Sequence, residues 1–183
     1  MKKLLTLIVG LALAFLVSSA ALAENMTVNL GVDFGGTHAQ GTDKYTNAGI
    51  SIGAEYNISQ LAENLSWGVG LEYQLSRTNY DTSAGTFSFI PVYVAGTYQI
   101  RNAESGLFIP FVTARLGYNF LSGDSNYKND VGNDLKGGIY YSVGGGVSLA
   151  NLAAVKLLYD INTGSATNNI TYSKLRLLCS YSF

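Results

Sequence analysis

The sequence is poor in the residues on which several classes of protein depend. Its 183 residues include one cysteine, Cys179, one histidine, His38, and two prolines. A single cysteine excludes an internal disulfide, and one cysteine with one histidine cannot form a tetrahedral zinc site. Only 13% of the residues are charged, which is few for the surface of a soluble domain. The formal net charge is −1, so nothing indicates a nucleic-acid partner.

Long apolar runs are also missing, apart from one at the N-terminus. Two lysines precede an apolar stretch at 4–17, and small residues follow it up to Ala23. This order is typical of a cleavable secretory signal peptide, and the run is shorter than the ~20 residues of a spanning helix. We expect a signal peptide at 1–23 and one domain at 24–183. Removal of the two lysines leaves 9 basic and 12 acidic residues, a net charge of −3.

The sequence is rich in glycine and tyrosine, and its apolar residues alternate with polar ones. Residues 65–76, "LSWGVGLEYQLS", alternate without a break. A stretch of this length matches the ~9–11 residues with which a tilted strand crosses a bilayer. Eight such stretches predict an antiparallel all-β fold, with strands at about 26–35, 47–57, 65–76, 86–100, 106–121, 138–149, 153–162 and 170–183.

The polar face of these strands is built from small residues and isolated charges. Small residues suit the narrow lumen of an eight-stranded barrel, and buried charges need partners of opposite sign. We therefore expect the apolar face to contact lipid and the polar face to line a closed, charge-paired lumen. Four acidic and four basic residues make up this predicted network: Asp33, Glu55, Glu72, Arg115, Lys156, Asp160, Lys174 and Arg176.

The connections and aromatic residues predict the orientation in the membrane. The stretches 36–46, 77–85, 122–137 and 163–169 read as long polar loops, whereas 58–64, 101–105 and 150–152 read as short turns. Short turns of outer-membrane barrels face the periplasm, which would place both mature chain ends there. Aromatic residues of the apolar face fall near the strand ends, as interfacial girdles do. The predicted girdle is Phe34, Tyr56, Trp67, Tyr73, Tyr98, Phe108, Tyr118, Phe120, Tyr141, Tyr159 and Tyr181.

With this ending, "LRLLCSYSF", the chain resembles the small OmpA/OmpX-like outer-membrane barrels of Gram-negative bacteria. The resemblance covers the whole mature chain and implies an eight-stranded, antiparallel, up-and-down transmembrane β-barrel. It implies that Phe183 and Tyr181 form the signal read by the barrel-assembly machinery, after delivery by periplasmic chaperones. The expected surroundings are outer-membrane lipid and lipopolysaccharide. We expect a monomer without cofactor or metal.

Three functions are compatible with such a barrel. The first is a non-enzymatic surface protein for adhesion or envelope integrity, and the second is a narrow porin-like channel for small or apolar solutes. The third is a lipid A-modifying enzyme based on His38, with Asp43, Asp81 and Ser76 as conceivable partners. Catalysis depends on a geometry that sequence does not reveal, so we interpret His38 as a solvated loop residue and expect no catalytic site.

Two further motifs have simple interpretations. "GVDFGGT" at 31–37 is similar to the phosphate-binding hairpin of sugar-kinase-type ATPases, but an exported chain of this length cannot hold two nucleotide-binding lobes. We interpret it as a strand followed by a glycine turn, with Asp33 in the lumen. The acidic stretch 122–134 has a lysine at an EF-hand ligand position and lacks the glycine of that motif, so we expect a mobile polar loop.

Overall fold

A computed structural model describes residues 25–39, 43–78, 85–101, 107–150 and 152–183. The predicted signal peptide at 1–23 lies outside these residues. Within the described part of the chain, no helix is long and apolar enough to cross a membrane.

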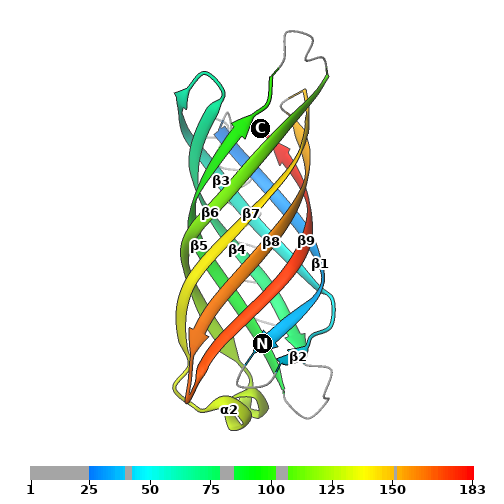
Figure 1. Cartoon of the computed structure of the whole chain (residues 1–183). Coiled ribbons are helices and arrows are strands. Elements are labelled where there is room, and N and C mark those ends of the chain that lie inside the picture. The colour runs from blue at the N-terminus through cyan, green and yellow to red at the C-terminus, as the bar shows by residue number, and fades with distance from the viewer. Residues whose placement is uncertain (1–24, 40–42, 79–84, 102–106, 151) are drawn as a thin grey trace.

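The fold is a closed barrel of antiparallel strands (Figure 1). Each long strand pairs with the next along the chain, and the last strand pairs with the first, so the backbone ladder has no open edge between them. The predicted eight-stranded up-and-down barrel is therefore confirmed. The elements are β1 Met26–Ala39, β2 Asp43–Tyr45, β3 Gly49–Ala62, β4 Leu65–Thr78, β5 Thr86–Gln99, β6 Phe108–Gly123, α2 Ser125–Val131, β7 Lys136–Leu149, β8 Ala153–Ser165 and β9 Asn169–Ser182.

The second barrel strand is divided into two pieces, β2 and β3. β2 pairs with the last three residues of β1, and β3 pairs with Met26 to Asp33 of β1. Between them, the Thr46 N–H donates to the Gly36 carbonyl at 2.9 Å. The short β2 therefore continues the line of β3 and adds no ninth wall strand.

The two ends of the barrel differ. The first strand starts and the last strand ends at the same rim, where the Phe183 N–H donates to the Met26 carbonyl at 2.9 Å. We call this the terminal rim. Helix α2 lies at the opposite rim (Figure 1), which we call the helix rim.

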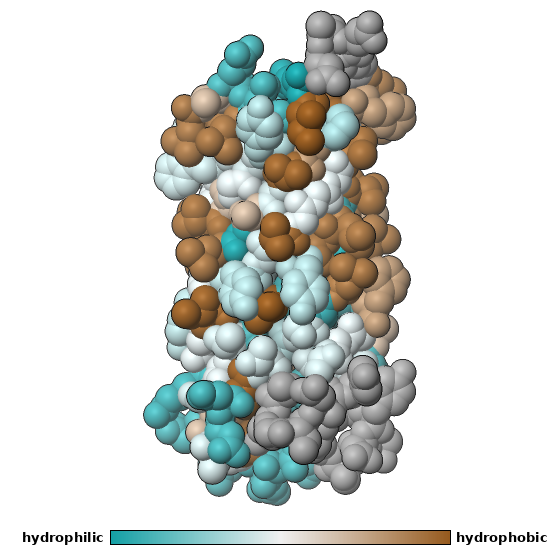
Figure 2. Space-filling model, in the orientation of Figure 1, coloured by the Kyte–Doolittle hydropathy of each residue, from teal (hydrophilic) through white to brown (hydrophobic). Residues whose placement is uncertain are grey.

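The wall has an apolar outer face and a polar inner face. Leu116 is 64% exposed, whereas the preceding Arg115 is 2% exposed. This contrast repeats along the strands because successive side chains point to opposite faces of a sheet. Figure 2 shows hydrophobic residues over the middle of the outer wall and hydrophilic residues gathered at both ends.

The predicted alternation of long loops and short turns holds only in part: 79–85 and 124–135 separate strands at the helix rim, and 63–64 and 150–152 do so at the terminal rim, but other connections differ from it. At the helix rim the strands run further than expected, so that β1 and β2 are separated by 40–42 and β8 and β9 by 166–168. At the terminal rim, 100–107 separates β5 from β6. The stretch 122–134 is not a mobile loop, since it contains α2, whose Tyr127 and Val131 are buried.

Candidate functional site

The barrel interior holds a network of ion pairs, which begins nearest the helix rim at Asp33 of β1. Arg77 Nε donates to Asp33 Oδ2 at 2.9 Å, and Lys174 Nζ lies 3.0 Å from the same oxygen. Lys174 also donates to Gln74 Oε1 at 2.7 Å. All three charged side chains are fully buried. One carboxylate thus joins β1, β4 and β9 across the lumen.

The middle of the network is centred on Arg176 of β9. Its guanidinium pairs with Glu72 of β4 and contacts Asp160 of β8, with 2.8 Å between Nε and Oδ2 and 3.1 Å between Nη2 and Oδ1. Arg176 Nη2 also donates to the Tyr140 hydroxyl at 3.2 Å. A planar guanidinium can hold two carboxylates in this way because its five N–H donors form a rigid fork.

The third part of the network surrounds Glu55 of β3, towards the terminal rim. Arg115 pairs with Glu55, and Lys156 Nζ lies 3.8 Å from Glu55 Oε2. Asn29 Nδ2 and the Tyr93 hydroxyl donate to the same oxygen at 3.0 and 3.3 Å. The Arg115 guanidinium lies over the Tyr93 ring, 4.8 Å from its centroid.

These parts are connected into one network. Arg115 Nη1 lies 3.5 Å from Glu72 Oε2, which joins the middle to the Glu55 group. Gln74 Nε2 donates to Glu72 Oε1 at 3.1 Å, which joins the middle to Lys174. A chain of polar contacts therefore runs along the lumen from Asp33 to Lys156.

The structure places all eight predicted charged residues inside the barrel. Lys156 is the most accessible of them, with a side chain 11% exposed. A ninth charged residue, Arg77, completes the network and was predicted to lie in a loop. It faces inward because the pairing of β4 with β5 shifts by one residue between Gln74 and Arg77, and such a bulge inverts the alternation beyond it. The described interior therefore contains five basic and four acidic residues.

Beyond the ion pairs, a hydrophobic cluster fills the lumen at the helix rim. We call it the apolar cap. Ring centroids of Phe87 and Tyr127 lie 5.2 Å apart, and those of Phe87 and Tyr172 lie 5.4 Å apart. Its buried members come from β5, β6, α2 and β9: Phe87, Phe89, Leu121, Tyr127, Val131, Ile170 and Tyr172.

Helix α2 is attached to β5 by Asp124, the N-cap residue that precedes it. The Asp124 carboxylate accepts a hydrogen bond from the Tyr127 N–H at 2.8 Å, and the Thr86 N–H and hydroxyl donate to its other oxygen at 3.0 and 2.9 Å. By accepting from the Tyr127 N–H, Asp124 satisfies a backbone donor of the first turn of α2, as an N-cap residue does. The bond from the Tyr127 N–H is the largest cause that lowers the pKa of Asp124 below its usual range. Desolvation raises the pKa of the Tyr127 hydroxyl, which keeps it a neutral hydrogen-bonding group.

His38 is not a solvated loop residue, and that prediction is wrong. It belongs to β1, is fully buried, and its Nε2 lies 2.9 Å from the Tyr127 hydroxyl. The centroids of the His38 and Phe87 rings lie 5.0 Å apart. The bulge in β1 between Asp33 and Gly36 turns His38 inward. Ser76, proposed as a partner, is exposed on the outer face.

The other conceivable partners of His38 cannot be compared with it. Asp81 lies outside the described residues, and the Asp43 side chain is not described. Within the described part of the chain, no group of three or more His, Cys, Asp or Glu residues could hold a metal ion.

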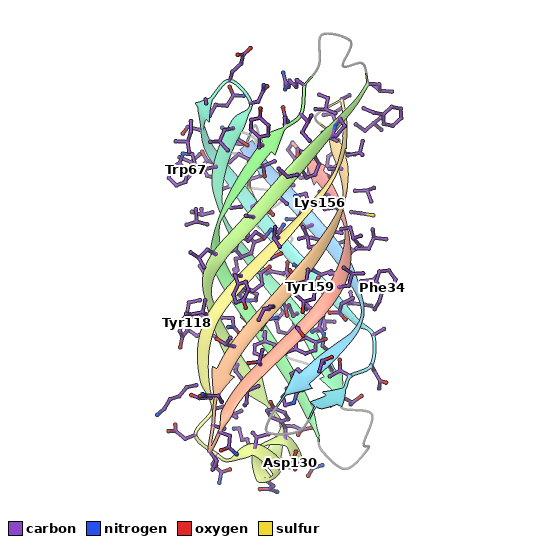
Figure 3. The ribbon with its side chains drawn as sticks, viewed as in Figure 1. Phe34, Trp67, Tyr118, Asp130, Lys156 and Tyr159 are labelled. Carbon is purple, nitrogen blue, oxygen red and sulfur yellow. The ribbon has the colours of Figure 1, made fainter. Side chains whose placement is uncertain are left out.

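The predicted girdle residues lie on the outer wall. Phe34, Trp67 and Tyr118 point away from the barrel (Figure 3). Trp67 and Tyr73 are half-buried, and the other nine are exposed: Phe34, Tyr56, Tyr98, Phe108, Tyr118, Phe120, Tyr141, Tyr159 and Tyr181. At the chain end, the rings of Tyr181 and Phe183 are in edge contact, with centroids 5.0 Å apart. Cys179 is exposed on the same outer face.

Residues 9–183 match the model of the outer membrane protein beta-barrel domain. The chain belongs to this outer-membrane β-barrel family. The resemblance inferred from the sequence is thus confirmed, and the family supports a location in the bacterial outer membrane.

Solved structures with the same fold have low sequence identity to this chain. Neisserial surface protein A is 18% identical, with a TM-score of 0.56 over 86% of this chain and 97% of that one. The outer membrane enzyme PagL is 17% identical, with a TM-score of 0.54 over 86% and 99%. The attachment invasion locus protein Ail of Yersinia pestis is 14% identical, with a TM-score of 0.49 over 87% and 99%. No curated protein sequence matches the chain.

Proposed function

We propose that this protein is a structural and surface-interaction barrel of the outer membrane, with a role in adhesion or envelope integrity, and that its lumen is closed. The observation that carries this proposal is the polar network that crosses the lumen from Asp33 to Lys156. Ions would have to displace paired, fully buried side chains to pass, and such pairs are costly to separate. Contacts with the surroundings would then be made by the outer wall and the rims.

The apolar cap gives independent support against conduction. Its aromatic rings fill the lumen at the helix rim, on the far side of Asp33 from the terminal rim. A narrow porin-like channel would need a hydrated path through both the cap and the ion pairs. Water and ions avoid an apolar constriction of this kind, as hydrophobic gates in channels do.

Conductance in planar bilayers tests the closed lumen. We expect the refolded protein to give no steady channel openings, whereas a fourfold variant with Arg176→Ala, Arg115→Ala, Phe87→Ala and Tyr127→Ala should give openings, because two bridging cations and two rings of the apolar cap are removed together. Arg101→Ala, at an exposed rim position, is the matched control and should stay silent. Steady openings of the unsubstituted protein, as large as those of the fourfold variant, would show that the lumen conducts.

The enzymatic alternative receives less support. His38 is covered by Tyr127 and Phe87, and the outward-facing Ser76 cannot act as its nucleophile. The fold itself does not decide, because one fold can host unrelated functions, and both a surface protein and an enzyme share it here. We therefore favour a non-enzymatic role.

The orientation and assembly of the barrel are also proposals. We propose that the terminal rim faces the periplasm and the helix rim the exterior, where lipopolysaccharide surrounds it. The exposed Tyr181 and Phe183 side chains at the end of β9 are available to the barrel-assembly machinery once chaperones have delivered the chain. We propose a monomer, since the described ladder is closed and leaves no long strand to pair with a second copy.

A further inference from the structure

The hairpin formed by β3 and β4 extends beyond the terminal rim. The first described pair between β1 and β3 joins Met26 to Tyr56, so residues 57–62 of β3 continue past the start of β1. The alternation of buried and exposed side chains stops there, and residues 56–63 are all exposed. Figure 1 shows this hairpin at the upper left. Its β4 arm stays paired with β5 up to Leu65, and the Gln99 N–H donates to the Asn64 carbonyl at 2.8 Å. Both faces of the β3 arm are therefore accessible, whereas residues 64–67 of the other arm are half-buried.

Two bulges place the large aliphatic residues of this ribbon outside the ladder. The pairing of β3 with β4 shifts between Asn57 and Ser59 and again between Gln60 and Ala62. The unpaired residues are Ile58 and Leu61, which are 42% and 65% exposed. Because a bulge re-aims the side chain of its extra residue, the hairpin presents these two side chains to its surroundings.

The exposed residues continue the lipid-facing surface. Trp67 of β4 points outward (Figure 3), and its Nε1 donates to Ser59 Oγ at 2.8 Å, so the ribbon is attached to an aromatic residue of the outer wall. In the shared view of Figures 2 and 3, hydrophobic surface continues past the level of Trp67 towards the hairpin end. The tip itself is polar, with Glu63 and Asn64 between the strands.

We propose that Ile58 and Leu61 contact lipid and thereby hold the β3–β4 hairpin in the headgroup region of the lipid leaflet nearest the chain ends. Apolar side chains bounded by an interfacial tryptophan on one side and a polar tip on the other fit a shallow position. The occupant is lipid because this surface is continuous with the wall that lipid already covers. The inference rests on the proposed function only in taking the barrel as embedded in a membrane.

A fluorophore at the hairpin end measures this depth. A Cys179→Ala chain carrying Ala62→Cys, labelled with NBD and refolded into phosphatidylcholine vesicles, keeps both aliphatic residues. We expect its emission at shorter wavelength than that of the same label placed by Asn129→Cys on α2. Brominated lipids should quench it most when the bromines lie near the headgroups. Quenching equal to that at Asn129→Cys, or strongest with bromines near the bilayer centre, would overturn the proposal.

Serine substitutions test whether the two aliphatic residues hold the hairpin. Ile58→Ser with Leu61→Ser should abolish headgroup-level quenching of the label, whereas Leu107→Ser with Leu152→Ser, at the other connections of the terminal rim, should leave it unchanged. Equal quenching in both variants would refute the role of Ile58 and Leu61.

The single tryptophan provides a separate control in the same samples. Trp67 reports insertion of the barrel wall, so we expect lipid quenching of Trp67 to persist when the label at 62 moves into water. Absence of Trp67 quenching in the unsubstituted chain would contradict the insertion of the barrel into the membrane, and not the position of the hairpin in the headgroup region. If a serine variant fails to insert, the comparison of labels at 62 and 129 still decides the proposal.

Discussion

Replacement of Arg176 should reveal how strongly the barrel depends on its internal ion pairs. The side chain is fully buried and holds Glu72 and Asp160, which belong to β4 and β8. Arg176→Met keeps much of the volume of the side chain and removes its charge. Two carboxylates then lose their central cation inside a closed lumen.

The expected loss of stability follows from the fate of these carboxylates. Breaking a buried ion pair costs about 3–5 kcal/mol because the remaining charge has no partner. Proton uptake sets a limit, since protonating a glutamic acid of ordinary pKa near ~4.3 costs about 3.7 kcal/mol at pH 7. Glu72 also keeps Arg115 at 3.5 Å and the amide of Gln74. We therefore expect Arg176→Met to lower the free energy of unfolding by about 3 kcal/mol.

Urea titration of the protein refolded into vesicles measures this change, with Trp67 fluorescence as the signal. Arg101→Met is the control: Arg101 is exposed, and its loss should change stability by no more than about 0.5 kcal/mol. Adding Asp160→Asn to Arg176→Met should recover part of the loss, because Asp160 forms its ion pair with Arg176 whereas Glu72 keeps Arg115. A loss below about 1 kcal/mol for Arg176→Met would refute the reasoning, as would a combined variant less stable than the single one.

Two further predictions concern the backbone and the helix. Gly35→Ala should destabilise the barrel by about 1–2 kcal/mol in the same titration, because Gly35 has a φ of 79° and a Cβ would lie 2.8 Å from the Thr46 carbonyl oxygen. Gly96→Ala meets no atom within 4 Å and should cause no loss; equal effects would contradict the strain argument. Asp124→Ala should loosen α2 by about 1 kcal/mol, seen as faster amide hydrogen exchange at Tyr127. The pKa of Asp124 is lowered in the folded state. The contribution of Asp124 to stability is therefore complete above the ordinary pKa near ~3.9 and is lost as the pH falls through the lowered pKa. An unchanged exchange rate in Asp124→Ala would exclude a role of Asp124 in holding α2.

The eight charged residues could be predicted because a strand has a strict period of two. Arg115 lies between Ala114 and Leu116 on β6, and once lipid was assigned to the apolar face, its side chain had to point inward. Their partners could not be predicted in this way. Arg176 of β9 meets Glu72 of β4 across the lumen, and such a contact depends on strand tilt and register, which local alternation does not encode.

Helix α2 was missed because its sequence is mostly polar and its signal is short. Asp124 precedes it as an N-cap residue, and Tyr127 and Val131 are spaced four apart, as residues on one helix face are. Over seven residues such a pattern competes with many random matches. The helix is stabilised by burying Tyr127 and Val131 in the apolar cap, and the cap exists only when β5, β6 and β9 have come together.

The two inward residues that the sequence analysis assigned to loops, His38 and Arg77, both follow a bulge. An extra residue in one strand of a pair inverts the facing of every side chain beyond it. In β1 a sequence signal is present, since Gly35 has positive φ next to the shift. In β4 the shift between Gln74 and Arg77 contains no glycine, and nothing local marks it. Without that bulge Arg77 would point outward and Lys174 alone would face Asp33. The irregularity is therefore what brings the ninth charge into the lumen, and deleting one residue between Gln74 and Arg77 should expel it.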